Sequence, residues 1–93
     1  MPVVICELEL FIPGANSLKA KRQVVKRVVE RIRSRCHAAV AETGFQDTWQ
    51  RAAVTAAMVG GSRKILDAQV NLMRNIVDDV GDAEVTLFDV EFL

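Results

Sequence analysis

Residues 3–36 read VVICELELFIPGANSLKAKRQVVKRVVERIRSRC, and the hydrophobic period of this stretch changes halfway along it. As far as residue 12, apolar side chains occupy every second position, which is typical of a strand with one buried face. A Pro-Gly turn follows, after which Ser17 can cap a helix. The expected buried stripe of that helix is Leu18, Val25, Val28, Val29, Ile32 and Cys36.

The rest of the chain repeats this alternation of period. Residues 38–43 and 48–59 flank the turn residues 44–47, which indicates a hairpin. Gly60-Gly61 ends the second strand of the hairpin, Ser62 caps a second helix, and residues 83–93 alternate again as a last strand. The second helix has its predicted stripe at Ile65, Leu66, Leu72, Met73, Ile76, Val77 and Val80, and Gly81 follows as a stop.

The order of elements is therefore βαββαβ. It predicts one α+β domain over residues 1–93, with the ferredoxin-like arrangement of a four-stranded antiparallel sheet and two helices on one face. Because the two helices run antiparallel in that topology, we expect Arg33, Arg35 and His37 to lie near Arg63 and Lys64. Lys19, Lys21 and Arg22 would meet Asp47, Asp78, Asp79 and Asp82 at the other end.

Charge is unevenly distributed along a chain whose net charge is zero. Eight of the twelve Lys and Arg residues lie between Ser17 and Cys36, with Glu30 as the single acid there. A helix built for stability would interleave acids with these cations, and cations in its first turns oppose the helix dipole. We therefore expect the helix to bind an anionic partner, with structured or ribosomal RNA held by its phosphates and no DNA sequence specificity. The predicted contacts are Lys19, Arg22, Lys26, Arg27, Arg31, Arg33 and Arg35. A solvated surface with long side chains over apolar edges is the alternative.

Two narrower anion sites are open at the helix starts. The first follows the Pro-Gly turn and the second the Gly-Gly pair, so free N–H groups and cations coincide at both places: Ser17, Lys19, Lys21 and Arg22 at one, and Ser62, Arg63 and Lys64 at the other. A plain helix cap is the alternative that explains both positions, and it is preferred. The chain has neither GxxxxGK[ST] nor GxGxxG, so no nucleotide signature accompanies them.

The sheet face away from the helices is predicted to be partly apolar. Val3, Ile5 and Ala53 share it with Trp49, and we expect a homodimer through this surface with Trp49 as its anchor. Glu7 and Glu9 lie on the same face and the aromatic pattern of RNA-recognition domains is absent, which excludes base stacking there. Arg51 is expected to pair with Glu7 or Glu9.

We expect no catalytic residues, metal or cofactor. His37 is the single histidine and has no activating neighbour in sequence, and Cys6 and Cys36 match no zinc or disulfide spacing. Both thiols are predicted to be buried, Cys36 as the last residue of its helix. Two unpaired thiols, the absence of a leader pattern and the absence of a long apolar run favour a cytoplasmic protein.

Two motifs resemble the YlxP-like family of small bacterial domains of unknown function. The first runs from Ile12 to Arg22, IPGANSLKAKR; the second joins Val40-Ala41-Glu42 to residues 47–52, DTWQRA. The likeness spans essentially the whole chain, with departures at Cys36-His37 and Gly44-Phe45. It implies a ferredoxin-like fold and no established catalytic residues. Family members are commonly encoded beside translation and ribosome-maturation factors, an association that agrees with RNA binding.

Three functions follow, in order of preference. The first is a non-catalytic accessory protein that binds structured RNA through the basic helix. The second is a protein-interaction module that homodimerises through its sheet and docks an acidic protein. The third is a small-phosphoester or acyl-phosphate hydrolase, which ranks last because the loop after the first strand lacks an Arg.

Overall fold

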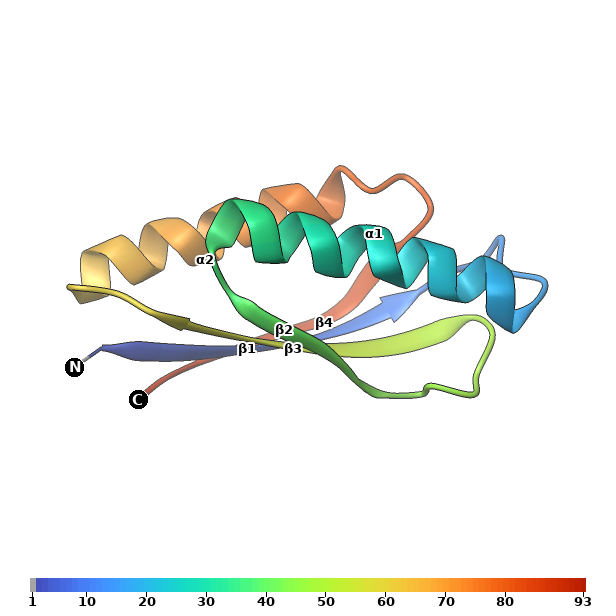
Figure 1. Ribbon diagram of the computed structural model, residues 1–93, viewed down its shortest axis with the longest axis horizontal. Coiled ribbons are helices and arrows are strands. Elements are labelled where there is room, and N and C mark those ends of the chain that lie inside the picture. Colours follow the sequence, from blue (N-terminus) through green and yellow to red (C-terminus); the bar gives the residue numbers. More distant parts are fainter. Residues whose placement is uncertain (1) are drawn as a thin grey trace.

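The computed structural model describes residues 2–93 and has two layers, a sheet and a pair of helices that cover one of its faces (Figure 1). The elements are β1 (Val3–Phe11), α1 (Leu18–Cys36), β2 (Ala39–Gly44), β3 (Arg51–Val59), α2 (Arg63–Asp78) and β4 (Glu84–Phe92). This order confirms the predicted ferredoxin-like α+β fold. Neither helix is long and apolar enough to cross a membrane.

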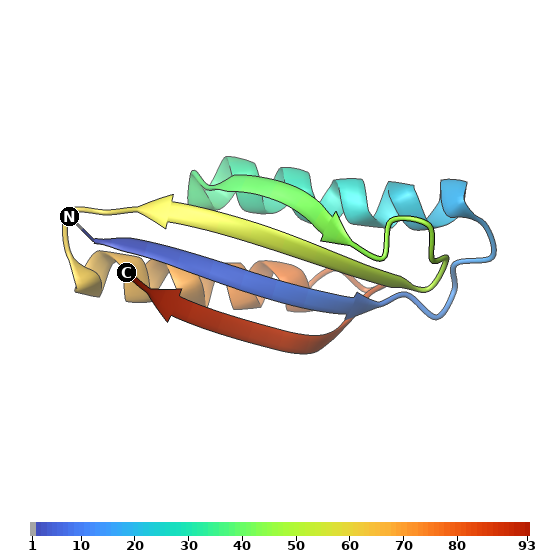
Figure 2. The ribbon, with the colours of Figure 1, turned by 90° about the horizontal axis from the view of Figure 1, so that it is seen from below.

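The sheet is antiparallel, with strand order β2-β3-β1-β4 (Figure 2). The long strands β1 and β3 form its centre, whereas the short strand β2 and the longer β4 form its two edges. Irregularities of register interrupt the β1–β4 ladder after Glu9 and the β2–β3 ladder after Glu42. Each edge strand is therefore irregular at one point, which increases the local twist.

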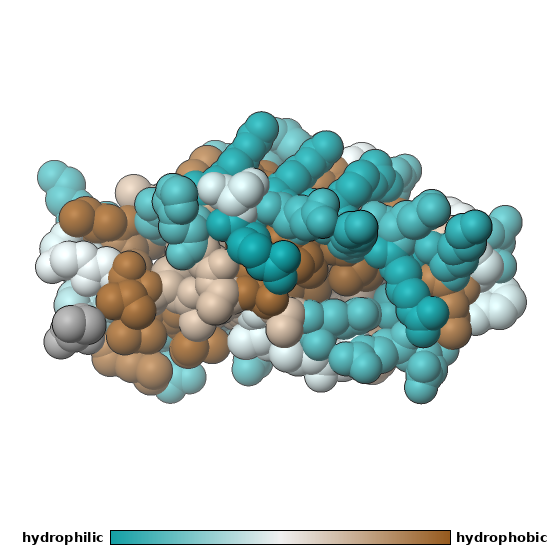
Figure 3. All heavy atoms as spheres, viewed as in Figure 1, coloured by the Kyte–Doolittle hydropathy of each residue, from teal (hydrophilic) through white to brown (hydrophobic). Residues whose placement is uncertain are grey.

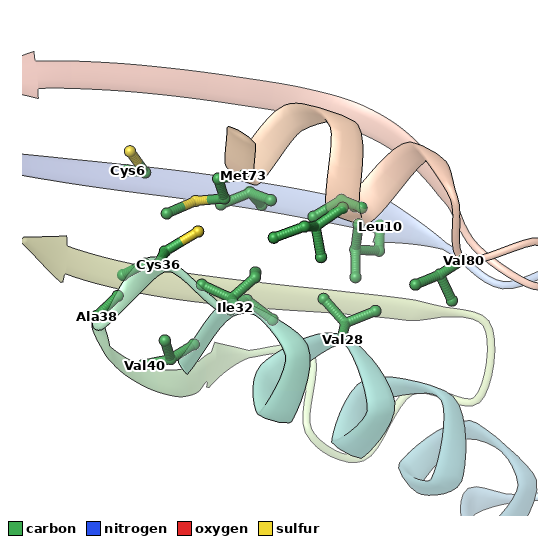
Figure 4. Packing of buried hydrophobic residues seen from close by; sticks show 14 of the residues in the cluster. Cys6, Leu10, Val28, Ile32, Cys36, Ala38, Val40, Met73 and Val80 are labelled. Carbon is green, nitrogen blue, oxygen red and sulfur yellow. The ribbon is translucent and has the colours of Figure 1, made fainter. Parts of the chain in front are cut away.

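The core lies between the sheet and the helices. Every second residue of β1, from Val4 to Leu10, is buried, as the alternation in the sequence predicted. These side chains meet Val28 and Ile32 from α1 and Met73 from α2, and the sulfur atoms of Cys6 and Cys36 belong to the same cluster (Figure 4). Both thiols are buried as expected, and Cys36 is the last residue of α1.

Serine caps start both helices. The Ser17 hydroxyl accepts a hydrogen bond from the Ala20 N–H at 3.1 Å, and the Ser62 hydroxyl accepts one from the Ile65 N–H at 3.2 Å. Each hydroxyl satisfies one of the four N–H groups that a helix start leaves without an internal partner. His37 ends α1 in the left-handed region, at φ 51°.

Two predicted details are wrong. Ile65 and Leu72 are exposed, whereas Val70 is buried, because α2 turns the 66-70-73-77 row towards the sheet. The third strand begins at Arg51 instead of residue 48, so Trp49 lies in the loop between β2 and β3. Position 45 of that loop is left-handed, at φ 57°, and the Arg51 guanidinium lies over the Phe45 ring at 3.9 Å.

Candidate nucleic-acid interface

Helix α1 carries its cations along the face that points away from the core. Hydrophilic side chains cover the length of this helix in the space-filling view, above an apolar area that is exposed at one end of the molecule (Figure 3). All the predicted RNA contacts are exposed there: Lys19, Arg22, Lys26, Arg27, Arg31, Arg33 and Arg35. One flank of α1 carries four cations at helical spacings, which are Lys19, Arg22, Lys26 and Arg33. This flank lies beside the edge strand β2, because Arg33 bonds to Val40 of that strand.

Two of these cations already have partners within the molecule. Arg27 forms an ion pair with Asp82 at 2.6 Å, in which both side chains are largely exposed. Arg33 donates a hydrogen bond from Nη2 to the Val40 carbonyl at 3.1 Å. Within residues 2–93, no carboxylate lies within ion-pair distance of the other five, which are Lys19, Arg22, Lys26, Arg31 and Arg35. We call these five side chains the free cations of α1.

Lys21 does not belong to an anion site, which corrects the prediction. Its side chain is fully buried, and its ammonium group donates to Glu42 Oε2 at 2.7 Å, to the Phe45 carbonyl at 2.8 Å and to the Gln46 carbonyl at 3.3 Å. Lys21 thus fastens α1 to β2 and to the loop that follows β2. Ser17 is occupied as a helix cap, so the first helix start offers no pair of hydroxyl and ammonium to an anion.

The start of α2 also differs from the expected anion site. Arg63 lies over the Phe92 ring at 3.4 Å and contacts Asp67 at 3.5 Å, while the Ser62 hydroxyl caps the helix. Lys64 is exposed. The Cys36 thiol approaches the Gln69 carbonyl, so α1 ends opposite the second turn of α2 and not opposite its first. The end of α1 therefore lies further along α2 from Arg63 and Lys64 than the predicted cluster with Arg33, Arg35 and His37 requires.

The pairing expected at the other end is also different. Of the four acids named there, Asp82 pairs with Arg27, a residue nearer the middle of α1 than predicted. Lys21 uses Glu42 instead. Neither Lys19 nor Arg22 has an ion-pair partner in the described part of the chain.

The sheet face away from the helices is open along its whole length (Figure 2). Val3, Ile5 and Ala53 lie on it and are partly exposed, whereas Trp49 projects from the neighbouring loop with 53% of its surface exposed. Arg51 pairs with Glu9 at 2.8 Å, as expected. Glu7, Asp89 and Glu91 occupy the same face, so this surface is acidic as well as apolar.

Two buried thiols have shifted pKa values. Burial raises the pKa of the Cys6 thiol, an effect that Arg74 opposes and Cys36 reinforces. Burial also raises the pKa of the Cys36 thiol. Both sulfurs are therefore protonated at neutral pH and poor nucleophiles. The described residues contain no group of three or more His, Cys, Asp or Glu side chains that could hold a metal ion.

The protein is thus a small ferredoxin-like α+β domain whose first helix exposes a row of cations. The chain belongs to a family described as a protein of unknown function, DUF503, which matches residues 3–90. The uncharacterized protein YlxP of Bacillus subtilis (strain 168) is 34% identical over 86 residues, which cover 92% of this chain and 94% of that protein.

Two solved structures share the fold. The de novo designed protein Foldit4 superposes with a TM-score of 0.56 at 12% identity, over 100% of this chain and 97% of the other. The structure of Rv0793 from Mycobacterium tuberculosis superposes with a TM-score of 0.55 at 15% identity, over 100% of this chain and 93% of the other. These likenesses concern the fold alone.

Proposed function

We propose that the protein binds structured RNA through the phosphate backbone, with α1 as its contact surface. The observation that carries this proposal is the set of free cations of α1, which have no carboxylate partner within residues 2–93. Unpaired cations on one helix raise its charge density without stabilising it, whereas each of them can neutralise a phosphate.

The geometry suits a backbone and not a single small anion. Lys19 and Arg33 are fourteen positions apart, or about 21 Å along a helix that rises 1.5 Å per residue. Lys26 and Arg22 lie between them on the same flank. Arg33 is not one of the free cations, but its guanidinium group keeps N–H donors beyond the bond to Val40. A row of this length can meet several successive phosphates, because each strand of a duplex carries one charge per nucleotide, which in DNA is one every ~3.4 Å of helix axis. Such contacts are independent of base sequence.

The distribution of the acids supports the same surface. Glu42, the acid beside the β2 flank, is neutralised by Lys21. Glu7, Asp89 and Glu91 lie on the opposite layer, on the open face of the sheet. Helix α1, with eight cations and the single acid Glu30, therefore carries an excess of positive charge that favours the approach of a polyanion at low salt.

The test is a fluorescence-anisotropy titration of a structured RNA at several salt concentrations, beginning near ~50 mM. The variant Arg22→Gln/Lys26→Gln removes two positive charges from α1. The matched control Lys64→Glu changes the net charge by the same amount on α2. We expect the α1 variant to lower both the affinity and the slope of log K against log salt, the slope by about 1.4–1.8, since each lost phosphate contact removes about 0.7–0.9.

The control should bind with nearly the wild-type slope. Equal losses in the two variants would show that only net charge matters, and no binding by the wild type at low salt would remove the proposal. Binding to an acidic protein is the competing function of α1. A pull-down from nuclease-treated lysate separates the two, because a partner held through RNA is then lost.

A further inference from the structure

The two edges of the sheet differ in how their backbone groups are satisfied. In an antiparallel sheet, successive residues of an edge strand point their N–H and C=O groups alternately inwards and outwards. On β2, the outward carbonyls of Val40 and Glu42 accept hydrogen bonds from the side chains of Arg33 and Gln46, both at 3.1 Å. These two carbonyls are thus satisfied within the molecule, which is one way in which proteins prevent unwanted strand pairing.

The β4 edge is not closed in this way. The Leu93 N–H donates to the Val3 carbonyl at 2.8 Å, and the alternation then turns the backbone groups of Phe88, Val90 and Phe92 outwards. No side chain of residues 2–93 donates to or accepts from those groups. Three residues thus offer an N–H and a C=O each, along the outermost strand in Figure 2.

Acidic side chains accompany this free edge on the open face. Asp89 lies directly opposite Glu7 in the β1–β4 register, and Glu91 is two residues further along β4. Like charges directly opposite each other destabilise a sheet, and neither Glu7 nor Asp89 has a cation within ion-pair distance in the described chain. Together with Ile5 and Val90 they line a shallow hollow beside the edge.

The helix-facing side of β4 has the opposite character. Arg63 lies over the Phe92 ring at 3.4 Å and Arg74 over the Phe88 ring at 4.0 Å. The two faces of the strand therefore differ, with carboxylates on one and aromatic rings under guanidinium groups on the other. A strand added to this edge would meet the two faces with alternate residues.

We propose that the β4 edge binds an extended segment of a basic protein, which adds to the sheet as a fifth strand. Backbone bonds to Phe88, Val90 and Phe92 hold the segment, and Lys or Arg at alternate positions pairs with Asp89 and Glu91. A second copy of this chain is a poorer occupant, because two antiparallel β4 strands would bring the carboxylates of both copies together on one face.

The experiment uses a fluorescent, end-capped peptide of about eight residues in which Lys and Val alternate. One control peptide has the same composition with all Lys residues before all Val residues, and another has Glu in place of Lys. The protein variant is Asp89→Lys/Glu91→Lys. Its charge-matched control is Asp47→Lys/Asp79→Lys, which changes two exposed acids away from β4. Amide hydrogen exchange of the full chain reports the backbone bonds.

We expect the alternating peptide to bind and to protect the amides of Val90 and Phe92. The β4 variant should bind it about tenfold more weakly, whereas the control variant should bind nearly as the wild type does. Binding without protection of those amides, or equal binding of the peptide with segregated Lys and Val, would overturn the strand-addition proposal. Protection of the same amides in the protein alone, with a dimeric mass in sedimentation, would assign the edge to a second copy. The test is independent of α1, so failure of RNA binding does not affect it.

Discussion

The Lys21–Glu42 pair allows the most direct test of the energetics of this fold. The Lys21 ammonium group is fully buried, with one carboxylate and two carbonyls as partners. Glu42→Gln preserves size and removes only the counter-charge. Breaking a buried ion pair costs about 3–5 kcal/mol, and the lower value applies here because the two carbonyls remain and the Glu42 side chain keeps 20% exposure.

We therefore expect Glu42→Gln to lower the free energy of unfolding by about 3 kcal/mol in urea denaturation. For a domain of this size, the melting temperature would fall by roughly 12–24 °C. Lys21→Met retains most of the apolar stem and removes the charge. In the double variant no ammonium group is left buried without its counter-charge, and the carbonyls of Phe45 and Gln46 lie in an exposed loop that water can reach. The double variant should consequently be more stable than Glu42→Gln alone.

The exposed ion pair Arg27–Asp82 is the control. Asp82→Asn should change stability by less than about 1 kcal/mol, because exposed pairs are solvated and screened. Two results would refute the reasoning. One is a loss of less than about 1 kcal/mol for Glu42→Gln, and the other is a double variant less stable than that single variant.

Three further predictions concern the caps, the core and the thiols. Ser17→Ala should cost about 1 kcal/mol in urea denaturation, with the same change at Ser62 as a comparison, and no loss at either position would contradict the capping role. Met73→Ala should cost about 2–5 kcal/mol, because it opens a cavity where both helices meet the sheet; a smaller loss would mean that the core collapses around the site. Because the fold raises the pKa of the Cys6 and Cys36 thiols, it favours their protonated form. The resulting contribution to stability is fully present below the ordinary pKa of 9.0 and is lost as the pH rises towards the folded pKa. Unfolding measured between pH 7.5 and about 10 should show a smaller alkaline loss in Cys6→Ala/Cys36→Ala than in the wild type, and equal losses would count against the thiols.

Hydrophobic period was sufficient for the architecture. The alternation in β1 and the seven-residue recurrence in α1 are strong signals, because each buries a complete face. The boundary at Arg51 was harder to predict, since residues 48–50 alternate like the strand that follows. In the structure, the loop that holds Lys21 through the carbonyls of Phe45 and Gln46 delays the start of β3.

The predicted buried stripe of α2 was wrong at three positions, because apolar residues also occur on the exposed flank of a helix. Ile65 and Leu72 are apolar and helical in spacing, yet they lie on the flank of α2 and remain exposed. A hydrophobic residue on the surface leaves no mark in the sequence, because much of any protein surface is apolar. Val70 was the missing member of the stripe, at the correct spacing between Leu66 and Met73.

The role of Lys21 could have been found in the sequence. The stripe predicted for α1 steps seven positions from Leu18 to Val25, and Lys21 occupies a helical position on the same face between them. Glu42 shares the helix-facing side of β2 with buried Val40. A cation and a carboxylate at two core positions indicate a buried pair.

The pairing of the surface cations could not be predicted in the same way. It depends on where α1 lies relative to the loop at Asp82, and tertiary packing sets that placement.

The unequal margins of the sheet limit how far strand addition can proceed. Because two outward carbonyls of β2 already accept from Arg33 and Gln46, a chain joined through β4 presents fewer free backbone groups at its other margin. Strand addition to the domain itself is therefore biased towards one margin, which disfavours the two-sided pairing from which fibres grow.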